Sequence, residues 1–458
     1  MQSQEHPIVA IATPLAPSAL AVLRLSGHGT LTLLAKRFDR PERIEAAAGH
    51  SMVHGRFIGA DGAPLDEVLV SVFRAPRSYT GEEAAEISCH GSPAGVRRIY
   101  GELLRAGFAA AEPGEFTRRA FGNGKLDLTQ AEAVNEIVCA QTAVAHSLAL
   151  DRLEGAVARE MTAIRERLVT LMAQLSIQLD YPEEDSGEVS LDREALSEVG
   201  GRIRELAATF DRGRLYQEGA RVALAGRTNA GKSSLFNRLL RQERSIVSDV
   251  HGTTRDYLEA VIDVGGIPVR LFDTAGLRLA GEAVEEEGIR RSGEIIRAAE
   301  LVLYVIDGSI GLTPEDRERM AAIPEQVAVI TVSNKSDLAA GHVSSATSSS
   351  VAVSAVTGEG VSELFALVER TLLEPTLVGS GGAGQDGGVA IDSERQHSAL
   401  VRAAEAIEET EASLEAGMPA DAVAVDLQEA ILAIGEITGE VASAEILDKM
   451  FGSFCVGK

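Results

Sequence analysis

The chain has 458 residues, of which 45% are hydrophobic and 24% are charged, and it carries a formal net charge of −25 at pH 7. This length predicts two to four domains, and the composition is typical of a folded globular protein. The acidic balance argues against non-specific polyanion binding, which needs several Lys or Arg side chains to release counterions. A local basic region or a basic partner could still bring RNA to the protein.

No apolar run reaches the roughly 18 residues of a membrane-spanning helix, and the N-terminus lacks a signal-peptide pattern. Cys89, Cys139 and Cys455 lie far apart in the sequence, which fits neither a disulfide framework nor a zinc site. We therefore expect a cytoplasmic protein with no membrane segment.

Residues 8–110 combine short β-rich runs with a helical segment, which predicts a mixed α/β domain. Asp61 and Gly62 mark a turn between two of these runs. The β-rich runs cover residues 8–13, 20–25, 52–57 and 68–73, and helical periodicity covers residues 93–106.

Long helices are predicted from Asp127 onward. Asp127 and Gln130 have the spacing of a capping box. An apolar seam typical of helix packing follows, with spacings of three and four residues. Its members are Met161, Ile164, Leu168, Leu171 and Leu175.

Helical patterns return at 393–414 and 421–434, after a Gly-rich stretch at 379–388 that indicates a flexible linker. Leu427, Ile431 and Ile434 share one face of the last segment. The simplest architecture is one discontinuous helical bundle that another domain interrupts.

Residues 219–374 alternate β-rich and helical segments, which predicts a three-layer fold around a mostly parallel sheet. Gly265 and Gly266 mark a hairpin near the sheet edge, and we expect a surface loop at 344–350. The β-rich runs cover residues 221–225, 269–272, 301–306, 327–332 and 351–353.

The phosphate-binding pattern Gly226-Arg-Thr-Asn-Ala-Gly-Lys232-Ser233 lies between a β-rich run and a helical segment. Its glycines let backbone N–H groups close around a β-phosphate, and the helix N-terminus adds a favourable dipole. Lys232 is expected to neutralise phosphate charge, and Ser233 to bind magnesium.

Asp273-Thr-Ala-Gly276 follows the second strand of the predicted hairpin. An acidic residue there can hold magnesium through water, and the Gly276 N–H can reach the γ-phosphate. We expect a second magnesium ligand and γ-phosphate sensor at Thr253 or Thr254, in the polar loop before the hairpin.

Asn334-Lys-Ser-Asp337 ends a β-rich run, and Ser354 with Ala355 ends the next one. The Asp337 carboxylate can accept two N–H groups from guanine that adenine cannot offer, and such a site can reject the wrong partner by about 10⁴-fold. Backbone N–H groups of Ser354 and Ala355 would close the base pocket. Four elements in this order predict GTP as the substrate and exclude an ATPase.

The residue after the Asp-x-x-Gly run is Leu277, where Ras-like GTPases place a water-orienting Gln. A Leu side chain cannot polarise water. The acidic cluster that follows (Glu282, Glu285, Glu286 and Glu287) is the nearest candidate, although from spacing alone a solvated helix N-terminus explains it better.

Five segments together carry a resemblance to a known family. They are Gly226-Arg-Thr-Asn-Ala-Gly-Lys-Ser-Ser234, Gly252-Thr-Thr-Arg-Asp256, Pro113-Gly-Glu-Phe-Thr117, Asn123-Gly-Lys-Leu-Asp127 and Phe454-Cys-Val-Gly-Lys458. Over nearly its whole length the chain resembles the MnmE (TrmE) family of tRNA-modifying GTPases. The phosphate-loop Asn and the terminal Cys-x-Gly-Lys make this resemblance specific.

The resemblance implies an N-terminal mixed α/β folate-binding and dimerisation domain (1–122), an all-α helical domain in two parts (123–217 and 376–458) and an inserted Ras-like P-loop G domain (218–375). It also implies hydrolysis activated by a potassium ion, held by Asn229, Ser248, Val250 and Thr253. A potassium ion can supply the charge that an arginine finger would bring. Magnesium would be held by Ser233 and Thr254. Glu285 takes the water-orienting role.

The implied contacts with GTP form a long set. Its members are Asn229, Ala230, Gly231, Lys232, Ser233, Ser234, Ser248, Asp249, Val250, His251, Gly252, Thr253, Thr254, Asp273, Thr274, Ala275, Gly276, Asn334, Lys335, Asp337, Ser354 and Ala355.

By the same resemblance, Arg24, Glu86, Lys125 and Lys458 contact a reduced folate, 5-formyl- or methylene-tetrahydrofolate. Cys455 would take part in catalysis. The implied reaction modifies carbon 5 of the wobble uridine in certain tRNAs, with a carboxymethylaminomethyl-type product. The implied assembly is a homodimer that forms a heterotetramer with an FAD-dependent MnmG-like protein.

An alternative function is a GTP-controlled switch, such as a ribosome-assembly GTPase, without modification chemistry. It predicts the same G domain, but no folate affinity and no role for Cys455. The C-terminal tail distinguishes these two functions. No helix cap or core pattern in the sequence requires Phe451-Gly-Ser-Phe454, so in a switch the tail should be dispensable, whereas the modification enzyme would use Cys455.

Overall fold

The computed structural model describes residues 6–180, 191–242, 259–273, 290, 293–338, 349–377, 389–441 and 443–458. The chain divides into two compact units. One comprises Met1–Cys139, Ala149–Arg165 and Ile431–Lys458, and the other comprises Ala140–Leu148 and Glu166–Ala430. Within the described ranges no helix has both the length and the apolar character needed to cross a membrane.

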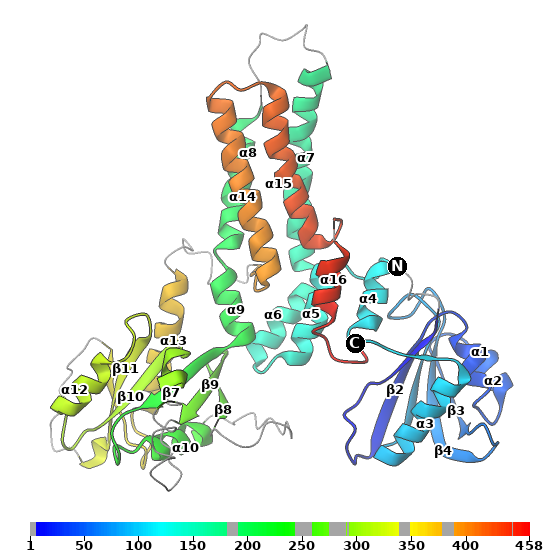
Figure 1. Cartoon of the computed structure of the whole chain (residues 1–458), viewed down its shortest axis with the longest axis horizontal. Coiled ribbons are helices and arrows are strands. Elements are labelled where there is room, and N and C mark those ends of the chain that lie inside the picture. The colour runs from blue at the N-terminus through cyan, green and yellow to red at the C-terminus, as the bar shows by residue number, and fades with distance from the viewer. Residues whose placement is uncertain are drawn as a thin grey trace. The chain divides into compact units, whose positions relative to one another are not determined.

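The first unit contains a six-stranded sheet in the order β3-β4-β5-β2-β1-β6. All neighbouring strands are antiparallel except the β1–β6 pair. Helices α1 (Thr30–Ala35) and α3 (Pro93–Ala106) pack on one face (Figure 1). The strands are β1 (Ile8–Ile11), β2 (Leu20–Ser26), β3 (Ser51–Ile58), β4 (Pro64–Phe73), β5 (Ala84–His90) and β6 (Ala109–Ala110).

The strands of this sheet alternate buried and exposed side chains, because successive residues face opposite sides. The four β-rich runs of the sequence correspond to β1, β2, β3 and β4. Strand β5 was not among the predicted β-rich runs. Its buried face consists of Ala85, Ile87 and Cys89, and small residues of this kind make a weak period-two pattern.

A capping box begins α5 (Leu128–Cys139), as predicted. The Asp127 N–H donates to Gln130 Oε1 (3.1 Å), and the Gln130 N–H donates to Asp127 Oδ1 (3.0 Å). At the other end of the chain, Phe451 closes α16 (Ala444–Phe451). Phe451 and Phe454 are buried in one cluster with Leu128 of α5. The expectation that no core pattern requires the Phe451–Phe454 segment was therefore wrong, because these two rings fill a core that the sequence pattern did not reveal.

Helices from two distant parts of the sequence form a bundle (Figure 1). Most of it belongs to the second unit, and residues 156–165 and 431–438 belong to the first. Ion pairs join consecutive helices of the bundle: Arg167–Glu198, Arg204–Glu408 and Arg402–Glu429. The five residues of the predicted seam are all buried, as are Leu427, Ile431 and Ile434. The helices are α7 (Ala156–Asp180), α8 (Arg193–Ala207), α14 (Glu394–Glu415) and α15 (Ala420–Thr438).

A second six-stranded sheet has the order β12-β11-β10-β7-β9-β8, and only the edge strand β8 is antiparallel. Its elements lie in sequence between α9 (Phe210–Glu218) and α14. The strands are β7 (Ala220–Ala225), β8 (Glu259–Val264), β9 (Ile267–Asp273), β10 (Leu301–Asp307), β11 (Ala328–Asn334) and β12 (Ser350–Ala352), and the helices include α10 (Lys232–Gln242), α12 (Pro314–Ala321) and α13 (Val361–Leu377).

Helices cover both faces of this sheet and give it three layers (Figure 1). Leu239 of α10 and Leu364 of α13 pack on one face, and Met320 of α12 packs on the other. The predicted loop at 344–350 needs one correction, because Ser350 already belongs to β12, where its backbone pairs with Thr331. Residues 344–348 and the linker 379–388 lie outside the described residues.

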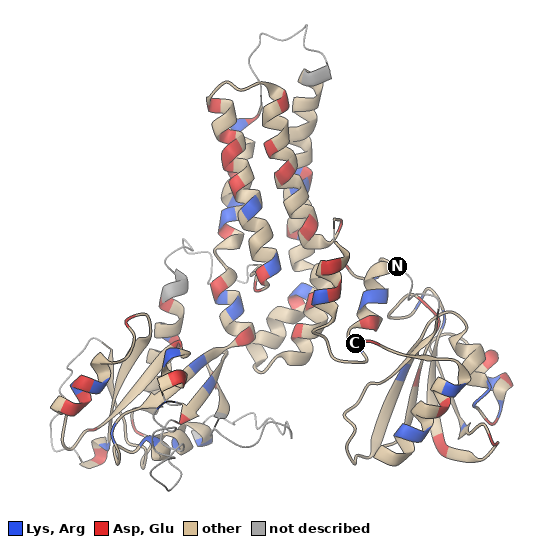
Figure 2. Cartoon of the chain, in the orientation of Figure 1, with Lys and Arg blue, Asp and Glu red and all other residues tan. Residues whose placement is uncertain are grey.

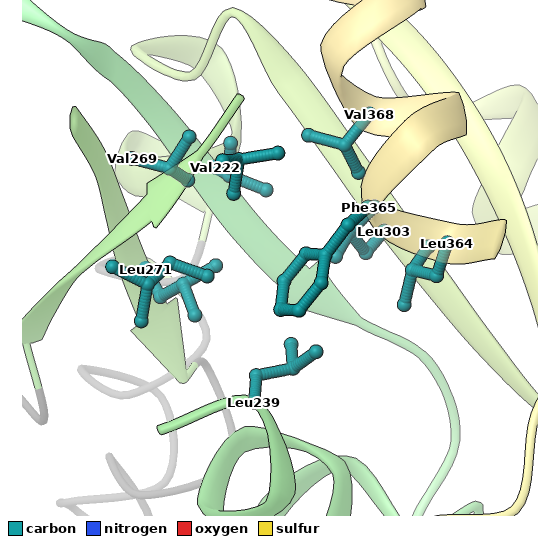
Figure 3. Close-up of a pocket in the computed structure, with 10 residues that line it drawn as sticks. Val222, Leu239, Val269, Leu271, Leu303, Leu364, Phe365 and Val368 are labelled. Carbon is teal, nitrogen blue, oxygen red and sulfur yellow. The ribbon is translucent and has the colours of Figure 1, made fainter. Parts of the chain in front are cut away.

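A small cavity of about 10 Å³ lies in the core of this sheet (Figure 3). Apolar side chains line it, including Val222, Leu239 and Phe365. A cavity must hold at least roughly 10–15 Å³ and offer polar partners before a water molecule enters. This cavity is therefore a packing gap.

Candidate functional site

The phosphate loop joins β7 to α10 through residues with unusual backbone angles. Gly226 (φ +135°) and Gly231 (φ +93°) lie so close to their neighbours that a Cβ atom would come 2.2 Å from the Val305 carbonyl oxygen and 2.1 Å from Asn334 Nδ2. Asn229 also has a positive φ of 65°, which Asn tolerates better than most residues. The loop conformation therefore depends on Gly at two positions and favours Asn at a third.

Three predicted phosphate and magnesium residues come together at the carboxyl ends of β7 and β9. Lys232 begins α10, and its ammonium group donates to the carbonyl oxygens of Gly226 and Arg227 (both 2.8 Å). The Ser233 hydroxyl donates to Asp273 Oδ2 (2.9 Å). Asp273 is 3% exposed. A buried carboxylate beside a hydroxyl is the hard oxygen donor set that Mg²⁺ prefers.

The other predicted residues of the phosphate region divide into two groups. Ala230 is buried within the loop, and Ser234 is exposed in the first turn of α10. The remaining members lie outside the described residues: Ser248, Asp249, Val250, His251, Gly252, Thr253, Thr254, Thr274, Ala275, Gly276 and Glu285.

Asn334 ties the predicted base loop to the phosphate loop. It is 2% exposed. Its Nδ2 donates to the Ala230 carbonyl (3.0 Å), and its Oδ1 accepts from the Ala355 N–H (3.1 Å). One amide side chain thus joins its own loop to two segments that are 104 and 21 residues away in sequence.

Asp337 and Lys335 lie in the loop that follows β11, and their side chains extend toward the strands on opposite sides of β11. Asp337 Oδ1 accepts from the Ser354 hydroxyl (2.6 Å) after β12, and Lys335 Nζ pairs with Asp307 Oδ2 (2.7 Å) at the end of β10. Asp337 is exposed and available to a ligand. The sequence analysis did not identify Asp307, because only the pairing of β10 with β11 places it beside Asn334.

A second group of predicted residues lies in the first unit, where the C-terminal tail meets the first sheet. Arg24 on β2 pairs with Glu86 on β5 (3.0 Å) and donates to the Gly457 carbonyl (3.1 Å). The charges of Arg24 and Glu86 both affect the Lys458 ammonium group. Burial lowers the pKa of Lys458, and the Arg24 charge lowers it further, against smaller opposing effects of Cys455 and Glu86.

Two aromatic rings that the sequence analysis did not identify flank Arg24. Its guanidinium carbon lies 5.4 Å from the centre of the Tyr79 ring and 5.7 Å from that of Phe116. The Tyr79 hydroxyl bonds to the Thr117 hydroxyl (2.9 Å), and burial raises the pKa of Tyr79. The fourth predicted folate residue, Lys125, is exposed, and its ammonium group donates to the Pro76 carbonyl (3.3 Å).

Flat rings, a guanidinium and an ammonium group suit a planar heterocycle that carries a carboxylate. Arg24, Tyr79 and Lys458 offer this combination, so the residues present fit a folate. Phe116 is 1% exposed and supports Arg24 from the core.

The tail reaches this group through backbone contacts. Pro113 and Val456 form an isolated β-bridge, and the Gly114 N–H donates to the Cys455 carbonyl (3.5 Å). Cys455 itself is exposed. Burial raises the pKa of Cys139, and the charge of the Cys455 thiolate raises it further.

Comparisons with known proteins match both parts of the chain. A model of the MnmE helical domain matches residues 128–455, and a model of the GTP-binding protein TrmE N-terminus matches residues 7–125. The tRNA modification GTPase MnmE of Symbiobacterium thermophilum is 41% identical over 470 residues, covering 99% of this chain and all of that protein. The protein of the same name from a Synechococcus species is 43% identical over 459 residues, covering 98% of this chain and 99% of that protein.

Proposed function

Since the chain belongs to the MnmE family of tRNA modification GTPases, we propose that it couples potassium-activated GTP hydrolysis to folate-dependent modification of wobble uridine. The single observation that carries the hydrolytic part is the convergence of Lys232, Ser233 and Asp273 at one sheet edge. The base loop at the same edge supports guanine as the base.

In this proposal Ser233 and Asp273 hold magnesium, Asp273 through water. Magnesium would neutralise charge on the phosphates when bound. Lys232, now bonded to two loop carbonyls, would turn toward the β- and γ-phosphates, because a phosphate is a stronger acceptor than a peptide carbonyl. Asp337 would accept the two guanine N–H groups, and the buried Asn334 would keep the base loop and the phosphate loop in register.

Potassium would bind at Asn229, the exposed residue of the phosphate loop with a left-handed backbone. Its side-chain amide oxygen is a suitable hard ligand for a monovalent cation. Ser248, Val250, Thr253 and Thr254 complete the proposed potassium and magnesium sites, and Glu285 is the proposed water-orienting residue.

Reduced folate, as the 5-formyl or methylene form, would bind where the tail meets the first sheet. Arg24 and Lys458 would face its carboxylates, and the Tyr79 ring would lie near its heterocycle. Glu86 would hold Arg24, and Lys125 is the proposed fourth contact. Cys455 would act on the uridine or on the one-carbon unit, since it adjoins this group in the chain.

The proposed assembly is a homodimer that joins an FAD-dependent MnmG-like partner in a heterotetramer. Acidic and basic residues are interspersed along the bundle helices (Figure 2). The net charge of −25 makes unaided binding of a polyanion unfavourable. A basic partner would bring tRNA to the protein.

The proposal is tested by measuring wobble-uridine modification in tRNA with the partner present. Cys455→Ser should abolish modification while GTP hydrolysis and the melting temperature stay at the values of the unaltered chain. Arg24→Ala should weaken binding of 5-formyltetrahydrofolate, again with the hydrolysis rate unchanged. Cys89→Ser is the matched control, because Cys89 is buried in the sheet core and is not part of the tail.

A chain with no folate affinity, whose Cys455→Ser variant modifies tRNA normally, would contradict this proposal. The GTP-controlled switch would then be the better description.

A further inference from the structure

Asp307 ends β10 directly beside the predicted base loop. In the parallel pairing of β10 with β11, Asp307 is the partner of Asn334, and the Gly308 N–H donates to the Asn334 carbonyl (2.7 Å). A Cβ atom at Gly308 would lie 2.7 Å from that same carbonyl oxygen. The two strand ends are therefore in such close contact that the Asp307 carboxylate can reach the loop that follows Asn334.

The Asp307 carboxylate is held by three bonds. Oδ1 accepts from the Ser309 N–H (3.0 Å) and the Ser309 hydroxyl (2.6 Å), which leaves Oδ2 for Lys335 Nζ (2.7 Å). Burial acts to raise the pKa of Asp307, but the bonds from Lys335 and Ser309 together lower it. Asp307 is therefore an anchored anion.

The Asp307–Lys335 ion pair fixes the direction in which the Lys335 side chain extends. The Lys335 backbone lies at the end of β11 with a φ of +64°, and its ammonium group reaches the end of β10. Its four-carbon stem therefore crosses between the two strand ends, while Asp337 points to Ser354 on the other side. Such a stem can cover an apolar surface while its charged end stays paired.

We propose that Asp307 is a positioning residue for guanine binding, which holds the Lys335 stem in place as one wall of the base pocket. This inference rests on the guanine site proposed above and adds a residue that lies outside its motifs. A free Lys side chain would lose rotamer freedom when a base binds. Because Asp307 already orders the Lys335 side chain, binding of the base does not include this loss of entropy.

The Lys335 ammonium group also neutralises Asp307. A second uncompensated carboxylate near the base would compete with Asp337 for the guanine N–H groups. The pair thus leaves Asp337 as the acceptor for the base.

The test measures GDP affinity, steady-state GTP hydrolysis and inhibition by inorganic tripolyphosphate, which has no base, on the full chain carrying Asp307→Asn. Because a charge-assisted bond is replaced by a neutral one, GDP affinity and KM for GTP should each weaken about tenfold. The kcat at saturating GTP and the inhibition constant of tripolyphosphate should stay unchanged. The Glu374→Gln control removes a carboxylate from the Arg370–Glu374 pair on α13 and should alter none of these values.

A double variant decides whether Asp307 acts through Lys335. Lys335→Met keeps an apolar stem without the ammonium group, so adding Asp307→Asn to it should cause no further loss of GDP affinity. Unchanged GDP affinity in Asp307→Asn, an equal loss of tripolyphosphate binding, or additive losses in the double variant would overturn the inference. Absence of GDP binding by the unaltered chain would instead overturn the guanine site itself, and this inference with it.

Discussion

Single residues at the nucleotide site owe their positions to bonds with distant parts of the chain. Asp273 is buried and receives the Ser233 hydroxyl, and Asn334 is buried with both ends of its amide bonded. Buried polar groups are costly unless they are paired. The domain therefore keeps these side chains in place before a nucleotide binds.

The first residue-scale prediction concerns Asn229. Hydrolysis should be much faster in potassium than in sodium at equal ionic strength, because the larger ion suits the proposed site. Asn229→Gly should erase this preference while GDP affinity stays nearly intact, since Gly adopts the φ of 65° without strain. Equal rates of the unaltered chain in the two salts would contradict the proposed ion site.

Asn229→Ala separates the side chain from the backbone. It lacks the amide oxygen and also meets strain at a positive φ. If only Asn229→Ala lost the preference for potassium, the backbone conformation would be the cause, and the side-chain oxygen would not be the ligand.

The second residue-scale prediction concerns Glu285, which lies outside the described residues. Glu285→Ala should slow hydrolysis about 10²-fold or more, the usual contribution of a positioned general base. GTP affinity should hardly change, because the carboxylate would act on water. Glu286→Ala and Glu287→Ala are the controls, and equal damage from either would mean that the cluster acts through its total charge.

At the scale of whole elements, the ends of strands and the C-terminal tail create both candidate sites. The carboxyl ends of parallel strands meet at one edge of a sheet, which is where α/β proteins bind ligands. The tail takes its place because Phe451 and Phe454 are buried against α5. Helix packing thus brings the tail to β2, where the Gly457 carbonyl accepts a bond from Arg24.

Gly114 tests the docking of the tail. It has a φ of +67°, and a Cβ atom there would lie 2.6 Å from the Phe451 carbonyl oxygen. Gly114→Ala should displace the tail and weaken binding of 5-formyltetrahydrofolate by about tenfold or more, with the GTPase rate unchanged.

Gly62→Ala is the matched control for Gly114→Ala. Gly62 also has a positive φ (+78°), but its Cβ would meet nothing within 4 Å. It should leave folate binding intact. Equal folate affinity in all three proteins would show that the tail position does not matter for the ligand.

At the scale of the whole molecule, the second sheet has its own two-faced core, and its strands are contiguous in the sequence between α9 and α14. The bundle, by contrast, needs helices from both sides of this segment. We therefore keep the division at 1–122, 123–217, 218–375 and 376–458 as a proposal.

The whole-molecule prediction follows from that division. Residues 218–375 expressed alone should fold and bind GDP with an affinity close to that of the full chain, because every described residue of the nucleotide site lies within them. Calorimetric titration with GDP would measure this. Loss of folding would contradict the proposed division and show that this segment needs the bundle helices for its stability.

The sequence by itself determined the family, the three-layer fold, the capping box of α5 and the buried seam of α7, because these depend on local patterns and contiguous motifs. Only the tertiary structure placed Asp307 beside Lys335, and Tyr79 and Phe116 around Arg24. It also revealed β5 and the buried rings of Phe451 and Phe454. The physical reason is that strand pairing and helix packing join residues at irregular and long separations in the sequence. No local pattern can predict such contacts.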